Sequence, residues 1–185
     1  LYSQVEKAFK NEPIGHYAKF KNATLSYYIG EFEWAKAQLD VLKAATSKLI
    51  ANDAMKLYLT IKDNISSDSS TIPLSMFSKA ELLNYKHKTA DAIALLDSIQ
   101  SSFGGHPIID DIILKKSQIL IATGRYDKAD SLLNLLAQNY SWGLLADEAL
   151  FIRANLNEEK LNNPTLAMDL YKQILTEYPS SIYVV

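Results

Sequence analysis

Two adjacent carboxylates, Asp110 and Asp111, form the pairing in this sequence that most resembles an acid–base catalyst. A pair of carboxylates in a cleft can divide the roles of acid and base, so the chemistry would be proton transfer during hydrolysis. Both residues stand where a helix is expected to begin, and carboxylates in a first turn are stabilised by the free N–H groups and the positive end of the helix dipole. The sequence therefore favours a structural role for this pair.

Three histidines could bind a metal, yet they lie in separate expected loops or helix starts. His16, His87 and His106 are far apart in the chain, and there are no cysteines, which excludes thiolate sites and disulfides. Gly104-Gly105 lacks the third glycine and the lysine of a phosphate-binding loop. No Gly-x-Ser-x-Gly elbow accompanies the many serines. We expect no metal, no cofactor and no enzymatic activity.

The charges exclude two further classes of partner. The sequence has 19 Lys and Arg against 21 Asp and Glu, interspersed along 185 residues, so a nucleic-acid backbone is not an expected ligand. No apolar run reaches the roughly 18 to 20 residues that span a bilayer, so no direct membrane insertion of this chain is expected.

The elements that would position any site are expected to be helices. Only six glycines and five prolines are present, and Ala, Leu, Lys and Asp are abundant. Breakers at regular places divide the chain into about ten helices of an all-α fold. The expected spans are 2–11, 16–29, 31–46, 51–65, 73–87, 89–102, 109–123, 125–139, 144–159 and 164–178.

An internal repeat organises these helices. Ala35, Ala92, Ala129 and Ala167 are each followed by large apolar residues four and seven positions later, and a small residue stands twelve or thirteen positions before each. Eleven positions after the last three alanines comes an aromatic residue: Phe103, Tyr140 and Tyr178. The four-three spacing keeps side chains on one helix face, and the small residue lets two helices approach closely. Each unit is therefore expected to be a helix pair.

The units are expected at about 16–49, 73–106, 110–143 and 146–179 of a single array covering 1–185, part of a longer chain. The key alanines are 57, 37 and 38 residues apart (35 to 92, 92 to 129, 129 to 167), so the first interval holds one extra helix, at about 51–65. Residues 180–185 are expected to begin a further, truncated helix.

The strings YYIGEFEWAKAQLDVL, IATGRYDKADSLLNLL and PTLAMDLYKQILTEYP resemble tetratricopeptide repeats, whose second helix follows a Gly-x-aromatic turn. The resemblance implies antiparallel helix pairs stacked as an α-solenoid, a right-handed superhelix with a concave face. The unit at His87 and Thr89 departs from it by lacking the Gly-aromatic turn, and the last unit has one extra residue before Pro164. The phrase LNNPTLAMDLYKQILTEYPSSIYVV is similar to the terminal repeats of bacterial envelope proteins of this family, which suggests the periplasm or cell envelope.

The resemblance implies that first-helix residues facing the concave side bind a protein or peptide partner. The expected partner-binding residues are Tyr17, Tyr27, Tyr28, Glu81, Asn84, Tyr85, Asp111 and Gln118. Phe20, Thr24, Phe77 and Leu114 belong to the same exposed set, the three large ones between groove and core. The set lacks the Lys, Arg and Asn cluster with which family members clamp a terminal carboxylate. An extended or helical segment with apolar anchors is the expected ligand.

The sequence thus predicts a scaffold or adaptor that holds a polypeptide. The alternative is a structural or self-association module of a larger protein that recruits no peptide. The oligomeric state stays open between them.

Overall fold

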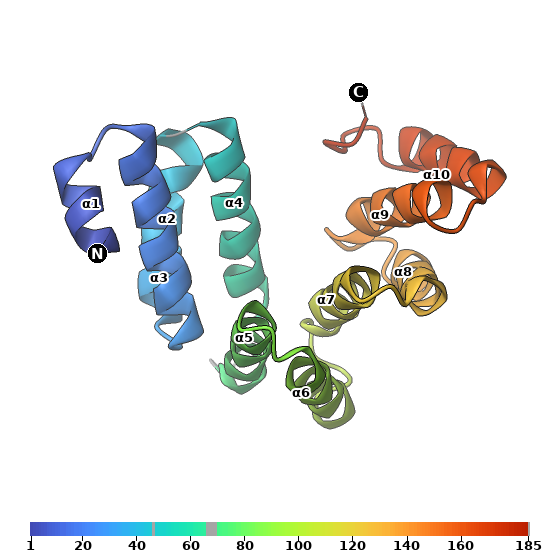
Figure 1. The fold of residues 1–185 in the computed structure, drawn as a ribbon, viewed down its shortest axis with the longest axis horizontal. Helices are drawn as coiled ribbons and strands as arrows, with labels where there is room; N and C mark the ends of the chain where they lie inside the picture. Colours follow the sequence, from blue (N-terminus) through green and yellow to red (C-terminus); the bar gives the residue numbers. More distant parts are fainter. Residues whose placement is uncertain (46, 66–69, 185) are drawn as a thin grey trace. The chain divides into compact units, whose positions relative to one another are not determined.

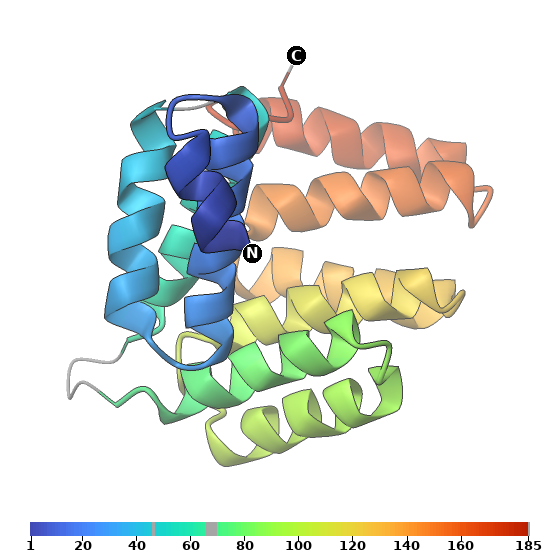
Figure 2. The same ribbon diagram turned by 60° about the vertical axis from the view of Figure 1, so that its left-hand side comes forward.

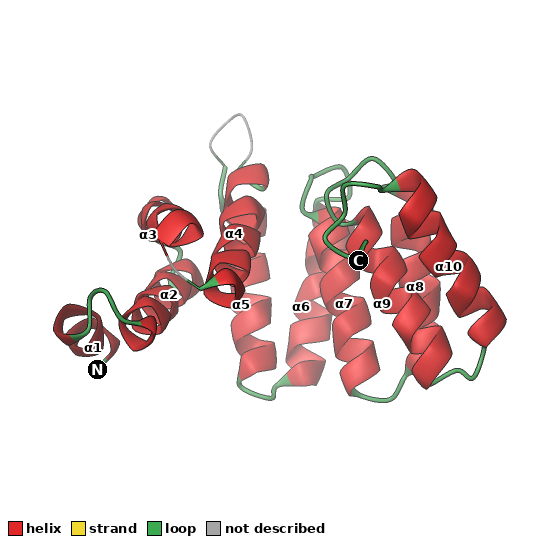
Figure 3. Ribbon diagram, turned by 90° about the horizontal axis from the view of Figure 1, so that it is seen from above, coloured by secondary structure: helices red, strands yellow, loops and turns green. Residues whose placement is uncertain are grey.

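Ten α-helices and no strand make up the part of the chain that this computed structural model describes, residues 1–45, 47–65 and 70–184 (Figure 1). The predicted all-α class and helix count are confirmed. The helices are α1 (Tyr2–Ala8), α2 (Pro13–Tyr28), α3 (Phe32–Ala45), α4 (Lys48–Asp63), α5 (Ile72–Tyr85), α6 (Thr89–Ser102), α7 (Ile109–Ala122), α8 (Tyr126–Asn139), α9 (Ala146–Glu159) and α10 (Pro164–Glu177). Within the described residues, Figure 3 shows helices joined by short loops.

The chain forms two compact units, Leu1–Ile108 and Ile109–Val185. In the first unit, consecutive helices from α1 to α4 pack on one another, and α5 packs on α6. The helix α2 also contacts α4 and α5. Figure 2 shows the blue and cyan helices of this unit side by side. The helix α2 is therefore the one that contacts most of the other helices of this unit.

The repeat frame forms the core of the first unit. Ala23, Ala35, Leu39 and Leu42 are all at most 1% exposed, so the small residue and the four-three spacing meet where α2 crosses α3. The predicted extra helix is α4, which begins earlier than expected, at Lys48. Its Ile61 is fully buried, so α4 contributes to the core of this unit.

Pro13 and Gly15 lie inside α2, which begins at Pro13, and not in the gap expected between the helices at 2–11 and 16–29. Proline is tolerated in a first turn, where its missing N–H would have no helical partner. Gly15 is buried, and a Cβ at this position would lie 1.8 Å from the carbonyl oxygen of Phe9. The glycine is needed for the close approach of the preceding turn, not to end a helix.

The second unit is a simple succession of helices, in which α7 packs on α8, α8 on α9 and α9 on α10. Its frame residues Ala129, Leu133, Leu136 and Ala167 are buried. At the position four after the last alanine, Tyr171 is only half-buried, and its hydroxyl donates to Asn155 Oδ1 at 2.5 Å. The frame predicted the burial of these alanines and leucines, because its spacing places them on one face of each helix.

The turns inside the helix pairs all contain one residue in the left-handed conformation, including the turn expected to differ. Gly30, His87, Gly124 and Asn162 all have positive φ, at 86°, 60°, 72° and 51°. The residue after each of the first three donates its N–H to the carbonyl five residues earlier, at 2.8 to 2.9 Å. This is the bonding of a Schellman helix end. The Gly-aromatic sequence is therefore absent at His87, but the turn itself is present.

The turns that follow the second helices also repeat. Phe103, Tyr140 and Tyr178 end α6, α8 and α10, with φ between −126° and −131°. The carbonyl of each accepts an N–H bond from the residue three positions later, at 2.8 to 2.9 Å. Phe9 ends α1 in the same way, with φ −125° and a 3.0 Å bond from Glu12. α1 therefore has the ending of a second helix, which the sequence prediction missed.

The helix expected to begin at 180 is wrong for the described residues 180–184, which form turns. The ring of Tyr183 stacks on Phe151 with centroids 4.3 Å apart and 16° between the planes. Val184 packs against the same apolar cluster. In Figure 1 this segment lies beside α9 and does not continue α10. Packing of these side chains holds the backbone in turns.

Candidate functional site

One face of α2 carries apolar and aromatic side chains, three of which are about half exposed to solvent. Ile14, Tyr17, Lys21, Leu25 and Tyr28 follow one another at intervals of three, four, four and three residues, so they share a face of the helix. Ile14 is 55% exposed, Tyr17 47% and Leu25 50%. We call these five residues the α2 face. It is an amphipathic stripe turned outward, since the core of the unit lies on other sides of α2.

A lysine at the centre of the α2 face rests on aromatic rings. Lys21 Nζ lies 5.1 Å from the ring centroid of Tyr17 and 5.9 Å from that of Phe20. Such cation–π contacts are worth about 0.5 to 1 kcal/mol at exposed sites. They hold the ammonium group over the aromatic surface, which makes the middle of the face positive.

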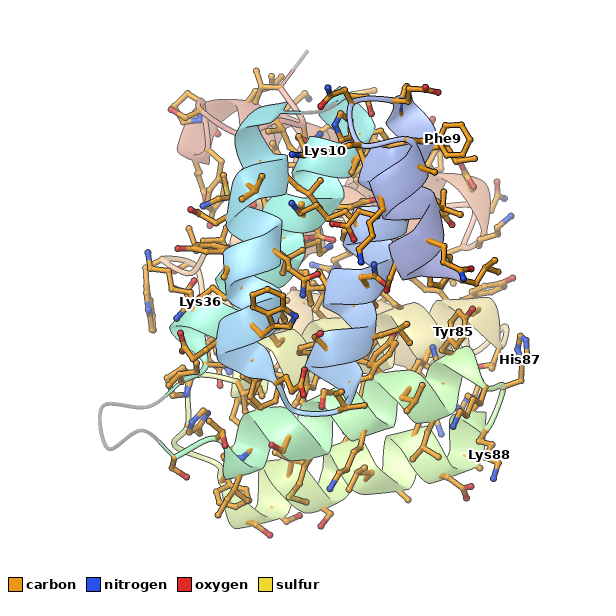
Figure 4. The ribbon with its side chains drawn as sticks, turned by 90° about the vertical axis from the view of Figure 1, so that its left-hand side faces the viewer. Phe9, Lys10, Lys36, Tyr85, His87 and Lys88 are labelled. Atoms are coloured by element: carbon orange, nitrogen blue, oxygen red, sulfur yellow. The ribbon has the colours of Figure 1, made fainter. Side chains whose placement is uncertain are left out.

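The helix α5 borders the α2 face with a carboxylate and a further tyrosine. The buried Tyr27 donates its hydroxyl hydrogen bond to Glu81 Oε2 at 2.7 Å, which joins α2 to α5. Burial, the Glu81 carboxylate and Tyr85 raise the pKa of Tyr28 to about 12, so Tyr28 lies near both α5 side chains. Tyr85 is 70% exposed, and in Figure 4 it projects on the same side as His87.

The predicted partner-binding residues divide by exposure. Tyr17 and Tyr85 are exposed, and Tyr28, Glu81 and Asn84 are half-buried. Each of these five residues presents some surface to solvent.

The expected exposure of Tyr27 is wrong, because it is 1% exposed. Its ring lies 5.6 Å from that of Tyr28 and 5.8 Å from that of Phe32, so it fills the core between helices. Phe77 and Leu114 are also core residues, 2% and 4% exposed. These three positions support packing.

Asp111 and Gln118 belong to α7, in the second compact unit, and both are half-buried. The N–H of Asp111 donates to Asp110 Oδ1 at 2.8 Å, as expected for carboxylates in a first turn. Neither residue belongs to the α2 face.

Sequence reasoning missed Ile14, Lys21 and Leu25 as members of a common surface. The signal was present, since their three-four spacing with Tyr17 and Tyr28 follows the same rule as the core frame. Reading Pro13 to Gly15 as a break removed Ile14 from the helix. The charged Lys21 interrupts the apolar stripe, so Leu25 was not recognised as part of it.

Among the described residues, no three His, Cys, Asp or Glu side chains gather in a way that could hold a metal ion. Over the same residues, no helix is both long and apolar enough to cross a bilayer.

Comparison with known families adds one match. Residues 148–181 match the model of the tetratricopeptide repeat. The matched segment covers nearly all of α9, the whole of α10 and the turn at Tyr178. No curated protein matches the chain. The match identifies this helix pair as a tetratricopeptide repeat and confirms the predicted family for these residues.

Proposed function

We propose that this tetratricopeptide repeat protein binds a segment of another polypeptide on the α2 face, without catalysing a reaction. Tetratricopeptide repeats serve in general as protein–protein interaction modules. The observation that carries the proposal is the outward stripe on α2, where three apolar or aromatic side chains are about half exposed. Exposed apolar surface on a folded unit marks sites of association.

The chemistry of the α2 face defines the ligand. Ile14 and Leu25 offer aliphatic contacts, and Tyr17 offers a broad ring with a polar tip. Lys21, at the centre, favours a carboxylate on the ligand. The fitting partner is an extended or helical segment with two apolar anchors on either side of an acidic residue.

Two parts of the sequence prediction extend this proposal. Asp111 and Gln118 would be contacts on the second unit. The resemblance to envelope proteins would place the function in the bacterial periplasm or cell envelope, which fractionation of the host cell would test.

The test is selection of peptides from a random displayed library against the full chain. Synthetic copies of the enriched peptides are then titrated against three single variants. Tyr17→Ala and Lys21→Ala remove contacts of the α2 face, whereas Val41→Ala removes an equally exposed apolar residue of α3 (53%). We expect Tyr17→Ala to weaken binding roughly tenfold, the effect of losing an aromatic anchor.

Lys21→Ala should weaken most the peptides that carry an acidic residue, and Val41→Ala should leave all affinities unchanged. Melting temperatures must match the wild type in all three variants. Failure to enrich any peptide, or affinities indifferent to Tyr17→Ala and Lys21→Ala, would refute the proposed site.

A further inference from the structure

An exposed tryptophan stands in the turn between α8 and α9. Trp142 is 82% exposed, and Leu144, two residues later, is 68% exposed. The Trp142 ring lies 6.4 Å from that of Tyr140, with 39° between the planes. We call Tyr140, Trp142 and Leu144 the Trp142 edge. Neighbouring apolar side chains that stay outside the core mark surfaces of association.

The turn itself does not require the tryptophan. The turns after α1, α6 and α10 contain the same hydrogen bond, from an N–H to the carbonyl three residues earlier. At the place of Trp142 these turns carry a small or polar residue: Asn11, Gly105 and Ser180. All four residues at this place are exposed. Because a small or polar residue is compatible with the turn in three cases, the ring of Trp142 is not needed for the fold.

The turn after α10 lies beside the Trp142 edge. Tyr178 donates its hydroxyl hydrogen bond to the carbonyl of Ser141 at 2.7 Å, which joins the two turns. Burial, Glu177 and Asp147 raise the pKa of Tyr178, so both carboxylates lie close to this hydrogen bond. Two helices therefore bring acidic side chains to the turn that carries Trp142.

The charge around the Trp142 edge is negative. On the side of α7, a Cβ at Gly143 would lie 3.6 Å from Asp110 Oδ2. Residues 140–148 and 177–184 contain three carboxylates and no Lys, Arg or His. This charge repels a membrane surface with anionic lipids, whereas it attracts Lys and Arg of a polypeptide. The electrostatics therefore favour a basic segment of a protein.

The Trp142 ring supplies a contact that a cation can use. Tryptophan is the best aromatic partner for Lys or Arg, at about 6 Å or less from the ring centroid. The chain itself contains a contact of this kind, where Lys21 lies over Tyr17 at 5.1 Å. Trp and Arg are also enriched among the side chains that contribute most to binding at protein interfaces.

We propose that the Trp142 edge binds a basic segment of a partner polypeptide, with an Arg or Lys side chain over the Trp142 ring and an apolar side chain against Leu144. This site rests on the proposed function only in taking the protein to bind polypeptides, since the α2 face lies in the other compact unit. The α2 face favours an acidic ligand, so the two surfaces select segments of opposite charge.

The first experiment selects peptides that require the tryptophan. A random displayed library is depleted on Trp142→Ser and then enriched on the wild-type chain. Serine is the residue that the turn after α10 carries at this place, so the variant should keep the turn. We expect Lys and Arg to be enriched several-fold over the starting library. Failure to enrich any peptide, or enrichment without Lys or Arg, would overturn the proposed site.

The second experiment locates binding at the ring. An enriched peptide is titrated against Trp34→Phe, a chain in which Trp142 is the only tryptophan. Cover of the ring by the peptide should shift its fluorescence emission to shorter wavelength. An emission spectrum that does not change on binding would place the peptide elsewhere and refute the site.

Matched charge reversals test the acidic surroundings in the same background. Glu177→Lys should weaken binding about fivefold, because it replaces an attraction by a repulsion. Glu159→Lys makes the same change at the last residue of α9, the end away from Trp142, and should bind like its parent. Melting temperatures must match in both variants. Equal affinities of the two would contradict the role of the carboxylates.

Vesicles of phosphatidylcholine and phosphatidylserine test the competing class of partner. We expect no emission shift with them, because like charges repel. A shift with vesicles, in the absence of any peptide that requires Trp142, would assign the Trp142 edge to a lipid surface and overturn the proposed site.

The two proposals fail separately. Tyr17→Ala should not change the affinity of peptides that require Trp142. If no such peptide is enriched while other library peptides still depend on Tyr17, only the Trp142 edge is refuted.

Discussion

At the residue scale, the most informative position is His87. The sequence lacks the Gly-aromatic turn there, but the structure forms the turn all the same. Its φ of 60° is the left-handed conformation that Gly30 and Gly124 adopt in the corresponding turns. A Cβ disfavours that region, by about 1 to 2 kcal/mol for most residues, while glycine enters it freely. The repeat thus imposes a strained conformation on a histidine.

His87→Gly should therefore stabilise the chain. Relief of strain is partly offset by the greater freedom of glycine in the unfolded state, so the expected gain is at most about 1 kcal/mol. Chemical denaturation of the two proteins gives the difference in unfolding free energy. His87→Ala, which removes the imidazole but keeps a Cβ, is the control and should give no comparable gain. A loss of stability in His87→Gly would show that the imidazole contributes more than the strain costs.

Residue exposure was only partly predictable from the sequence. The core alanines and leucines of the frame were identified because their spacing recurs four times. Tyr27 and Tyr28 show the limit, since neighbours on a helix point about 100° apart and one is buried while the other is half-buried. A small error in the rotation of α2 is enough to confuse them.

At the element scale, a polar network joins α8 to α9. Arg153 Nε donates to Asp130 Oδ1 at 2.9 Å, and its Nη1 donates to Asn134 Oδ1 at 2.6 Å. Asn157, 2% exposed, donates to Asp130 Oδ1 at 2.6 Å. The Asp130 and Arg153 side chains are only 21% and 14% exposed. Because both side chains are largely buried, water cannot readily replace these hydrogen bonds when one partner is removed.

Asp130→Ala should cost about 3 kcal/mol or more, because it leaves a largely buried guanidinium without its carboxylate. Equilibrium unfolding in urea gives the loss. The matched control is Asp169→Ala, which breaks an exposed pair with Lys172 at 3.7 Å and should cost less than about 1 kcal/mol. Similar losses in the two variants would contradict the importance of the α8–α9 network.

The existence of the helices was predictable at this scale, but their polar contacts were not. Breakers and periodicity located all ten helices of the described residues within a few positions. Asp130 stands beside the frame residue Ala129, yet nothing in the repeat spacing pairs it with an arginine 23 residues later. Such a contact depends on how two helices are rotated against each other.

At the scale of the whole molecule, raised tyrosine pKa values determine the response to alkali. The pKa of Tyr28, Tyr171 and Tyr183 rises from 10.0 to about 12, mainly through burial, with neighbouring carboxylates adding to each. The unfolded chain loses these protons near its ordinary value, and the folded chain retains them to higher pH. The contribution of these tyrosines to the free energy of unfolding is therefore fully present below pH 10 and is lost as pH rises toward 12.

Urea unfolding across this pH range would measure the loss. Replacing the three tyrosines together by phenylalanine should flatten the decline, because the groups that titrate differently in the two states are removed. An unchanged slope in this variant would assign the alkaline loss to other groups.

The boundary between the two compact units, after Ile108, was not apparent in the sequence. The irregular spacing lies in the first interval, whereas the boundary falls inside the regular 37-residue interval from Ala92 to Ala129. Repeat spacing reports which helices pair. It does not report the strength of packing between successive pairs, which depends on the side chains at their interface.

The contact of α2 with α5 has a mechanical consequence. In the second unit each helix packs mainly on its neighbours in the chain, so a pulling force can peel helices away one after another. In the first unit the Tyr27–Glu81 hydrogen bond and the surrounding packing close a loop that contains α3 and α4. Stretched in an optical trap, this loop should stay shielded from tension until that contact breaks, and then lengthen in one large step.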